Sequence, residues 1–289
     1  MKNKPRSPTE PLVPAEIFQQ LRKPLTDFCA DLCRIPTVNP PGECYEEFVR
    51  FMAEALRRLG LKTKILRVPW AEQRRFIPDS RAWPRLNLLA RWNVGARRTL
   101  HFTGHYDVVP PTSGWTRDPF APLARGRRLY ARGAADMKGG LAAAVFAVRA
   151  LRESGLTPPW NIELSFTPDE ETGGACGLGW LVKRKHVRPD AAVLCEGGSG
   201  DHLGIAHRGV LWLEFTVHGK AAHASNPARG LNALERACGL IAELRALEKT
   251  FALRRSVWSG DLPARRPQMM LGGVCGGGGK VNTVPDRFT

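Results

Sequence analysis

The 289-residue sequence lacks several features that would assign it to other classes of protein. No apolar run approaches the roughly 20 residues that a helix needs to cross a bilayer. The N-terminus, MKNKPRSPTEPLVP, has none of the apolar stretch of a signal peptide. The seven cysteines include no CxxC pair and no disulfide-framework spacing. These absences favour a cytoplasmic protein with reduced cysteines and no membrane partner.

Acidic residues are few relative to basic ones: 27 Asp and Glu stand against 43 Lys and Arg, which gives a net charge of +16. Such a charge suggests nucleic-acid binding as one hypothesis. The arginines, however, come singly or in pairs along the whole chain, without a basic helix or interleaved aromatic residues. We therefore expect a solvated basic surface that attracts anionic substrates, and no nucleic-acid partner.

Strand-like apolar runs alternate with helical patterns in the first two thirds of the chain. The segment 137–155 reads as a buried helix that ends at Gly155. This alternation predicts an α/β domain with a mostly parallel sheet, in which ligands bind at the carboxyl ends of the strands. The strand-like runs are residues 61–68, 86–92, 99–104, 161–168 and 191–197.

The pattern changes after Gly209, where residues 210–219 alternate like a long strand, residues 232–247 read as a helix and residues 268–277 as another strand. This order predicts a small second domain. We expect three parts, namely a loose, proline-rich N-terminal arm over residues 1–24, a catalytic domain over 25–207 and the second domain over 208–289.

The segment TGHYDVVP places His105 and Asp107 on either side of Tyr106, so that their side chains share a face of an extended chain. An imidazole in this position can bind a metal while the carboxylate orients it. Taken alone, the pair is equally compatible with a core histidine that is hydrogen-bonded to Asp107.

Three acidic motifs follow, each at or after the end of an expected strand. Asp136 lies in GAADMKGG, Glu170 and Glu171 lie in TPDEETGG, and Glu196 lies in LCEGG. Each also has a simpler interpretation: Asp136 as a helix N-cap, the DEE run as a solvated turn, and Glu196 as a surface acid. Adjacent carboxylates at a strand end repel one another, and bound cations would relieve that cost.

One histidine and three carboxylates, Asp136, Glu171 and Glu196, form an oxygen-rich donor set that suits zinc, cobalt or manganese. Two such ions at roughly 3.5–4 Å could lower the pKa of a shared water. The remaining acid, Glu170, could then accept the proton of that water and pass it to a leaving amine.

These four motifs, in this order and spacing, resemble the family of acetylornithine deacetylases, succinyl-diaminopimelate desuccinylases, aminoacylases and glutamate carboxypeptidases, over residues 25–289. The resemblance implies a three-layer α/β catalytic domain and an inserted α+β, ferredoxin-like domain that pairs two subunits. It also implies two divalent metal ions, zinc first, and hydrolysis of the amide bond of N-acyl amino acids or small peptides.

Carried over by residue, the resemblance makes Glu170 the general base and gives the other motif residues their roles. His105 and Glu196 would bind one metal, Asp136 would bridge both, Glu171 would bind the second, and Asp107 would orient His105.

The second domain adds two further candidates. His223, in HGKAAHAS, matches a family histidine that holds the substrate carbonyl in the partner subunit's site and stabilises the oxyanion. Asn282 matches an asparagine that contacts substrate. A histidine among alanines in a loop is also often structural, which remains the alternative for His223.

In the family, the last metal ligand is a histidine far downstream. No histidine follows His223 in this sequence, so the chain departs from the family pattern at that ligand. Two hypotheses result. The chain is a hydrolase of this family, or it is a catalytically impaired, truncated family member or a dimerisation subunit.

Overall fold

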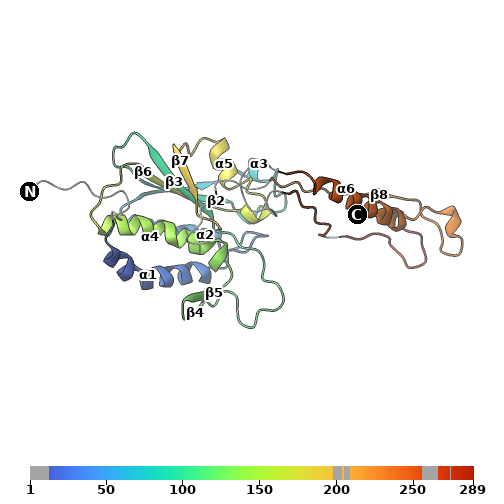
Figure 1. Ribbon diagram of the computed structural model, residues 1–289, viewed down its shortest axis with the longest axis horizontal. Coiled ribbons are helices and arrows are strands. Elements are labelled where there is room, and N and C mark those ends of the chain that lie inside the picture. Colours follow the sequence, from blue (N-terminus) through green and yellow to red (C-terminus); the bar gives the residue numbers. More distant parts are fainter. Residues whose placement is uncertain (1–12, 198–203, 205–208, 256–265, 274) are drawn as a thin grey trace, which may run out of the picture. The chain divides into compact units, whose positions relative to one another are not determined.

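The computed structural model describes residues 13–197, 204, 209–255, 266–273 and 275–289, and Figure 1 shows the arrangement of their helices and strands. The chain divides into two compact units, Met1–Leu203 and Gly204–Thr289. The domain boundary expected at residues 207 and 208 lies outside the described residues.

A five-stranded sheet forms the centre of the first unit, in the order β1-β2-β6-β3-β7. Strand β3 pairs in parallel with both β6 and β7, whereas β2 is antiparallel to both β6 and β1. Four strands therefore share one direction and β2 opposes them. The strands are β1 (Lys62–Arg67), β2 (Leu86–Trp92), β3 (Thr99–His105), β6 (Asn161–Thr167) and β7 (Ala191–Leu194).

The expectation of a mostly parallel sheet holds for β3, β6 and β7 and is wrong for the pairings of β2. Residues 93–98 join β2 to β3. A connection between parallel strands of one sheet takes about a dozen residues or more, usually including a helix. The short connection therefore fits a reversal of direction. Because β3, β6 and β7 run in parallel, their carboxyl ends meet at one edge of the sheet.

Helices cover both faces of this sheet and make three layers. The helices α1 (Ala15–Arg34), α2 (Tyr45–Arg58) and α4 (Gly139–Glu153) share one apolar cluster with Leu88 and Ala90 of β2. Figure 1 shows α1 and α4 side by side. On the opposite face, Leu89 joins a second cluster with α5 (Leu178–Lys183).

The expected loose arm over residues 1–24 is wrong from Ala15 onward, where α1 begins. Leu21, Cys29 and Leu32 are buried on this helix, and apolar residues at helical spacing give it a face that packs on α4. Proline content had suggested a loop, but Pro24 lies inside the helix. Residues 1–12 lie outside the described part of the chain.

Smaller elements connect the layers of the first unit. They are α3 (Trp70–Gln73), the hairpin of β4 (Leu123–Arg125) and β5 (Arg128–Tyr130), a π-helical turn at Ala134–Lys138 and a 3-10 turn at Glu170–Thr172. The π-helical turn directly precedes α4 and carries Asp136, and the 3-10 turn lies after β6 and carries Glu170 and Glu171.

The second unit contains α6 (Ala233–Phe251), which Asn232 caps by accepting hydrogen bonds from the amides of Leu234 and Glu235. A short 3-10 turn, Pro227–Arg229, precedes it. The strands β8 (Val217–His218) and β9 (Arg287–Phe288) form an antiparallel pair. In neither unit do the described residues include a helix long and apolar enough to cross a membrane.

The long strand expected over residues 210–219 is wrong, because only Val217–His218 is a strand. An alternating pattern forms a strand only where a neighbour pairs with its backbone. Residues 210–216 pair with no strand among the described residues, and Trp212 is 84% exposed. No described residue of the segment 268–277 belongs to one of the named strands, but Gly277 forms an isolated antiparallel bridge with Phe288 of β9.

Candidate metal centre

The carboxyl edge of the sheet brings the motif residues of the first unit together. His105 is the last residue of β3, Glu170 and Glu171 follow β6, and Glu196 follows β7. Asp136 lies in the turn before α4. The sheet topology explains this convergence, because parallel strands deliver their following loops to the same edge.

His105 is buried and uses both of its ring nitrogens. Nδ1 lies 3.0 Å from the backbone oxygen of Asp107, and Nε2 lies 3.0 Å from Oδ1 of Asp136. A carbonyl oxygen only accepts hydrogen bonds, so Nδ1 carries the proton and Nε2 offers its lone pair. That lone pair faces a carboxylate oxygen, and two acceptors at this distance require a proton or a cation between them.

The pKa of His105 reflects the same arrangement. Burial lowers it, but the hydrogen bond and charge of Asp107, together with the charges of Glu170 and Asp136, outweigh burial and raise it to about 9. In the absence of metal, the imidazole therefore holds a second proton at Nε2. A divalent cation in place of that proton would also compensate the negative charge of the carboxylates. The donor set therefore fits a metal ion.

Asp107 is fully buried and binds protein groups on several sides. Its carboxylate accepts hydrogen bonds from Nδ2 of Asn39 at 2.9 Å and from the amides of Glu170 and Glu171 at 3.2 Å each. Oδ1 also lies 3.3 Å from Nδ1 of His105. One carboxylate thus fixes both the imidazole and the backbone that carries the two glutamates.

Asp136 is exposed at the edge of the sheet and does not cap a helix. The helix α4 begins at Gly139 with Lys138 at its N-cap position. The interpretation of Asp136 as an N-cap is therefore wrong, and its carboxylate is directed to His105 instead.

Glu170 and Glu171 lie on the 3-10 turn after β6. Oε2 of Glu170 is 3.8 Å from Nε2 of His105. Burial is the largest cause of a raised pKa in both glutamates. Neighbouring acids add to it, chiefly Glu196 for Glu170 and Asp136 for Glu171, and His105 opposes them. The carboxylates are therefore crowded, and a bound cation would relieve their repulsion.

Two groups of side chains have the geometry of a metal site. The possible ligand atoms of His105, Asp136 and Glu171 all lie within 4.8 Å of one another, as do those of His105, Glu170 and Glu196. The structure thus brings together His105 with all four acids. It groups Glu196 with His105 and Glu170, whereas the family resemblance implies that His105, Glu196 and the bridging Asp136 share one metal.

Two other residues of the GAADMKGG motif serve packing. The ammonium of Lys138 is fully buried and donates to the backbone oxygens of Leu32 and Ile35 at the end of α1. Burial lowers the pKa of Lys138 to about 8. A Cβ on Gly140 would overlap the backbone oxygen of Cys195. Only glycine lets α4 approach the chain just before Glu196.

The two candidates of the second unit lie on neighbouring segments. The amide of Ala224 donates to the backbone oxygen of Asn282 at 2.9 Å, and His223 forms a β-bridge with Thr283. His223 is exposed, and its Nδ1 lies 2.8 Å from Oγ of Ser225. The roles expected for His223 and Asn282 stay predictions.

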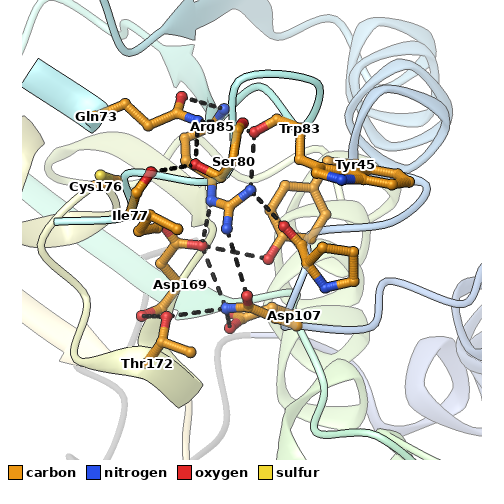
Figure 2. A network of polar contacts seen from close by, with 12 residues as sticks. Tyr45, Gln73, Ile77, Ser80, Trp83, Arg85, Asp107, Asp169, Thr172 and Cys176 are labelled. Carbon is orange, nitrogen blue, oxygen red and sulfur yellow. Dashed lines mark hydrogen bonds and ion pairs between the residues drawn. The ribbon is translucent and has the colours of Figure 1, made fainter. Parts of the chain in front are cut away.

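Sequence reasoning missed two buried residues beside the metal centre, Asn39 and Arg85. Nδ2 of Asn39 donates to Asp107, Asp169 and Thr172, and Arg85 forms an ion pair with Asp169 at 2.7 Å. Figure 2 shows this network. An arginine immediately before an apolar strand was the available signal for Arg85, while Asn39 gave none.

An imidazole and four carboxylates at the carboxyl edge of an α/β sheet define a candidate metal-dependent hydrolase. Comparison with protein families matches residues 101–282, more than half of the chain, to the peptidase family M20/M25/M40. The chain belongs to this family.

Curated relatives agree with this assignment. The chain is 36% identical to a succinyl-diaminopimelate desuccinylase of Gluconacetobacter diazotrophicus, over 77% of this chain and 56% of that protein. It is 34% identical to an acetylornithine deacetylase of Edwardsiella ictaluri, over 80% of this chain and 56% of that protein. The chain thus spans about half the length of the curated relatives it matches.

Solved structures share the fold. An M20 family metallo-carboxypeptidase of Sulfolobus solfataricus matches with a TM-score of 0.63 at 22% identity, over 91% of this chain and 69% of that one. Human carnosine dipeptidase 1 matches with a TM-score of 0.59 at 20% identity, over 95% and 70% of the two chains. At these identities the likeness concerns architecture alone.

Proposed function

We propose that this protein acts as a hydrolase that depends on two divalent metal ions, zinc first, and cleaves the amide bond of N-acyl amino acids or small peptides. The contact between Nε2 of His105 and Oδ1 of Asp136 carries this proposal, because its two acceptors require a cation or a proton between them. Family membership and the names of the curated relatives support the class of substrate.

Asp136, Glu171 and Glu196 would hold the ions together with His105. When bound, such ions lower the pKa of water and polarise a carbonyl oxygen. Asp107 keeps a proton of His105 on Nδ1, so that Nε2 is the nitrogen that would bind the ion.

Glu170 moves the proton in this proposal. Its carboxylate takes a proton from the attacking water and delivers it to the leaving nitrogen. Its raised pKa favours holding that proton between the two steps.

The remaining assignments rest on the family resemblance. We propose that residues 25–207 form the catalytic domain, and that residues 208–289 pair two subunits and bring His223 and Asn282 to the substrate. We also propose that the protein is cytoplasmic and forms a homodimer, and light scattering on the purified protein would test the dimer. The net charge of +16 supports a substrate that carries a carboxylate.

Metal content together with hydrolysis tests the proposal. We expect up to two zinc ions per chain after dialysis, and turnover of N-acetyl amino acids or dipeptides. Replacing Glu170 by Gln should keep the metal and lower kcat by about 10²- to 10⁴-fold.

The matched control is Glu72→Gln, because Glu72 binds Trp180 and Arg184 away from the metal centre. This variant should hydrolyse like the wild type. Full activity of Glu170→Gln would show that Glu170 is not the general base. Less than one metal ion per chain and no turnover would favour the catalytically impaired member instead.

A further inference from the structure

The side chain of Arg85 is completely buried at the start of β2, beside the metal centre. Burying a guanidinium is costly unless hydrogen bonds and an opposite charge compensate it. Figure 2 shows such partners of Arg85, the backbone oxygen of Trp83 and the carboxylate of Asp169, and the guanidinium also lies over the ring of Tyr45.

The contacts of Arg85 join three segments of chain. Nη1 donates to the backbone oxygens of Pro41 and Trp83 at 2.8 Å each, and Nη2 donates to Oδ1 of Asn39 at 3.5 Å. Nε lies 2.7 Å from Oδ1 of Asp169. The fork of the guanidinium therefore spans the loop after α1, the loop before β2 and the loop after β6.

Hydrogen bonds of Gln73 hold the backbone of Arg85 and the loop before β2, independently of Asp169. Oε1 of Gln73 accepts a hydrogen bond from the amide of Arg85, and Nε2 of Gln73 donates to the backbone oxygens of Ser80 and Trp83. Gln73 and Ser80 are themselves buried. The loop before β2 thus fixes the arginine in place, and the arginine can in turn fix Asp169.

Asp169 connects this arginine to the glutamates. Its backbone is left-handed, with φ at 67°, a conformation that a residue with a side chain adopts at a cost. Its backbone oxygen accepts hydrogen bonds from the amides of Thr172 and Gly174, which closes the turn that carries Glu170 and Glu171. Asn39 links Oδ1 of Asp169 to Asp107.

We propose that Arg85 is a positioning residue for amide hydrolysis, which rests on the proposed function. Its ion pair with Asp169 holds the left-handed turn after β6, so that Glu170 and Glu171 stay within reach of His105. Arg85 touches neither metal nor substrate in this role. It acts through Asp169 and Asn39 on groups that do.

Hydrogen exchange in the metal-free full-length chain tests the positioning itself. The amides of Glu170 and Glu171 donate to Asp107, so their exchange reports the turn. In Arg85→Met we expect faster exchange in the peptide covering residues 168–175. Arg85→Lys should show it too, because an ammonium lacks the planar fork.

The matched control is His101→Gln. His101 is also buried on the sheet and has two side-chain partners, Glu163 and Ser165, neither of which is a metal-centre residue. Its replacement should leave exchange of residues 168–175 unchanged. If Arg85→Met does not fold, Asp169→Asn removes the same ion pair with little change of shape and should show the same faster exchange. Unchanged exchange in the folded variants would overturn the proposal.

Metal affinity and kinetics test the consequence for function. We expect each Arg85 variant to lose about 10- to 100-fold in zinc affinity or in kcat, with KM nearly unchanged. An active wild type whose Arg85 variants keep both values would overturn the proposal. A wild type without metal or turnover would instead refute the proposed function, while hydrogen exchange would still decide whether Arg85 positions the turn.

Discussion

At the scale of single residues, His105 is the group on which the other motif side chains depend. Its Nδ1 is held by Asp107 and its Nε2 faces Asp136. Protonation and metal binding therefore compete for the same nitrogen. This competition gives the metal centre a pH dependence of known sign.

We expect zinc affinity to rise with pH up to about 9, the pKa of His105 in the metal-free protein. Below that pH the metal must displace a proton, so affinity should fall about tenfold per pH unit. Titration calorimetry in buffers with different ionisation enthalpies would count that proton.

The stability of the metal-free protein should show the opposite trend. The pKa of His105 is raised above that of an unfolded histidine, about 6.5. The contribution of His105 to the free energy of unfolding is thus complete below about pH 6.5 and is lost as the pH rises through about 9.

A zinc affinity that stays constant from about pH 6 to about pH 9 would contradict this account of His105.

The candidate ligands His105, Glu171 and Glu196 were predictable from the sequence because their motifs follow recognisable strands, whereas Asp136 lies in the turn before the recognisable helix α4. Asn39 and Arg85 were not, since their partners are remote in sequence. Asn39 and Asp169, for example, are separated by 130 positions. Local patterns carry no information on which distant polar group will share a buried pocket.

At the scale of elements, four of the five sheet strands were predictable almost to the residue, whereas β7 ends at Leu194, three residues before the end of the expected run 191–197. The run 86–92 coincides with β2, and the run 161–168 differs from β6 only at its end. The apolar side chains of β2 and β6 are buried, so composition and structure agree for these two strands. The segment 210–219 failed because its pattern was correct for a strand but no described neighbour pairs with most of it.

The packing of α4 on the end of β7 gives a prediction at this scale. Gly140→Ala should destabilise the first unit by about 1–3 kcal/mol, because the new methyl group overlaps the backbone oxygen of Cys195. The displaced chain carries Glu196, so zinc affinity should fall as well. Thermal melting and zinc titration would measure both effects.

The control for this variant is Gly239→Ala, in α6, where a Cβ meets nothing within 4 Å. Alanine is the better helix former by about 1 kcal/mol, so this variant should be as stable as the wild type or more stable. Equal stability of Gly140→Ala and the wild type would mean that α4 shifts freely.

At the scale of the whole molecule, the net charge of +16 is the property most directly connected to the proposed substrates. A basic surface raises the local concentration of anions near a cleft, and salt screens this attraction.

We expect kcat/KM for an N-acetyl amino acid to fall several-fold between about 0.05 M and about 0.5 M salt. The amide of the same N-acetyl amino acid, which lacks the carboxylate, is the control and should respond little. Equal salt dependence for both substrates would show that the net charge does not help to capture the substrate.

Lys138 and Gly140 also bear on how this sequence would change over generations. Both belong to a motif that suggests catalysis, yet both serve packing. Lys138 binds the end of α1, and Gly140 lies against the backbone of Cys195. A lineage that gave up hydrolysis would still need them in order to fold. It would be free to replace Glu170, whose half-exposed carboxylate supports no packing. In descendants of this chain, the identity of residue 170 would therefore reveal a loss of activity long before the glycines do.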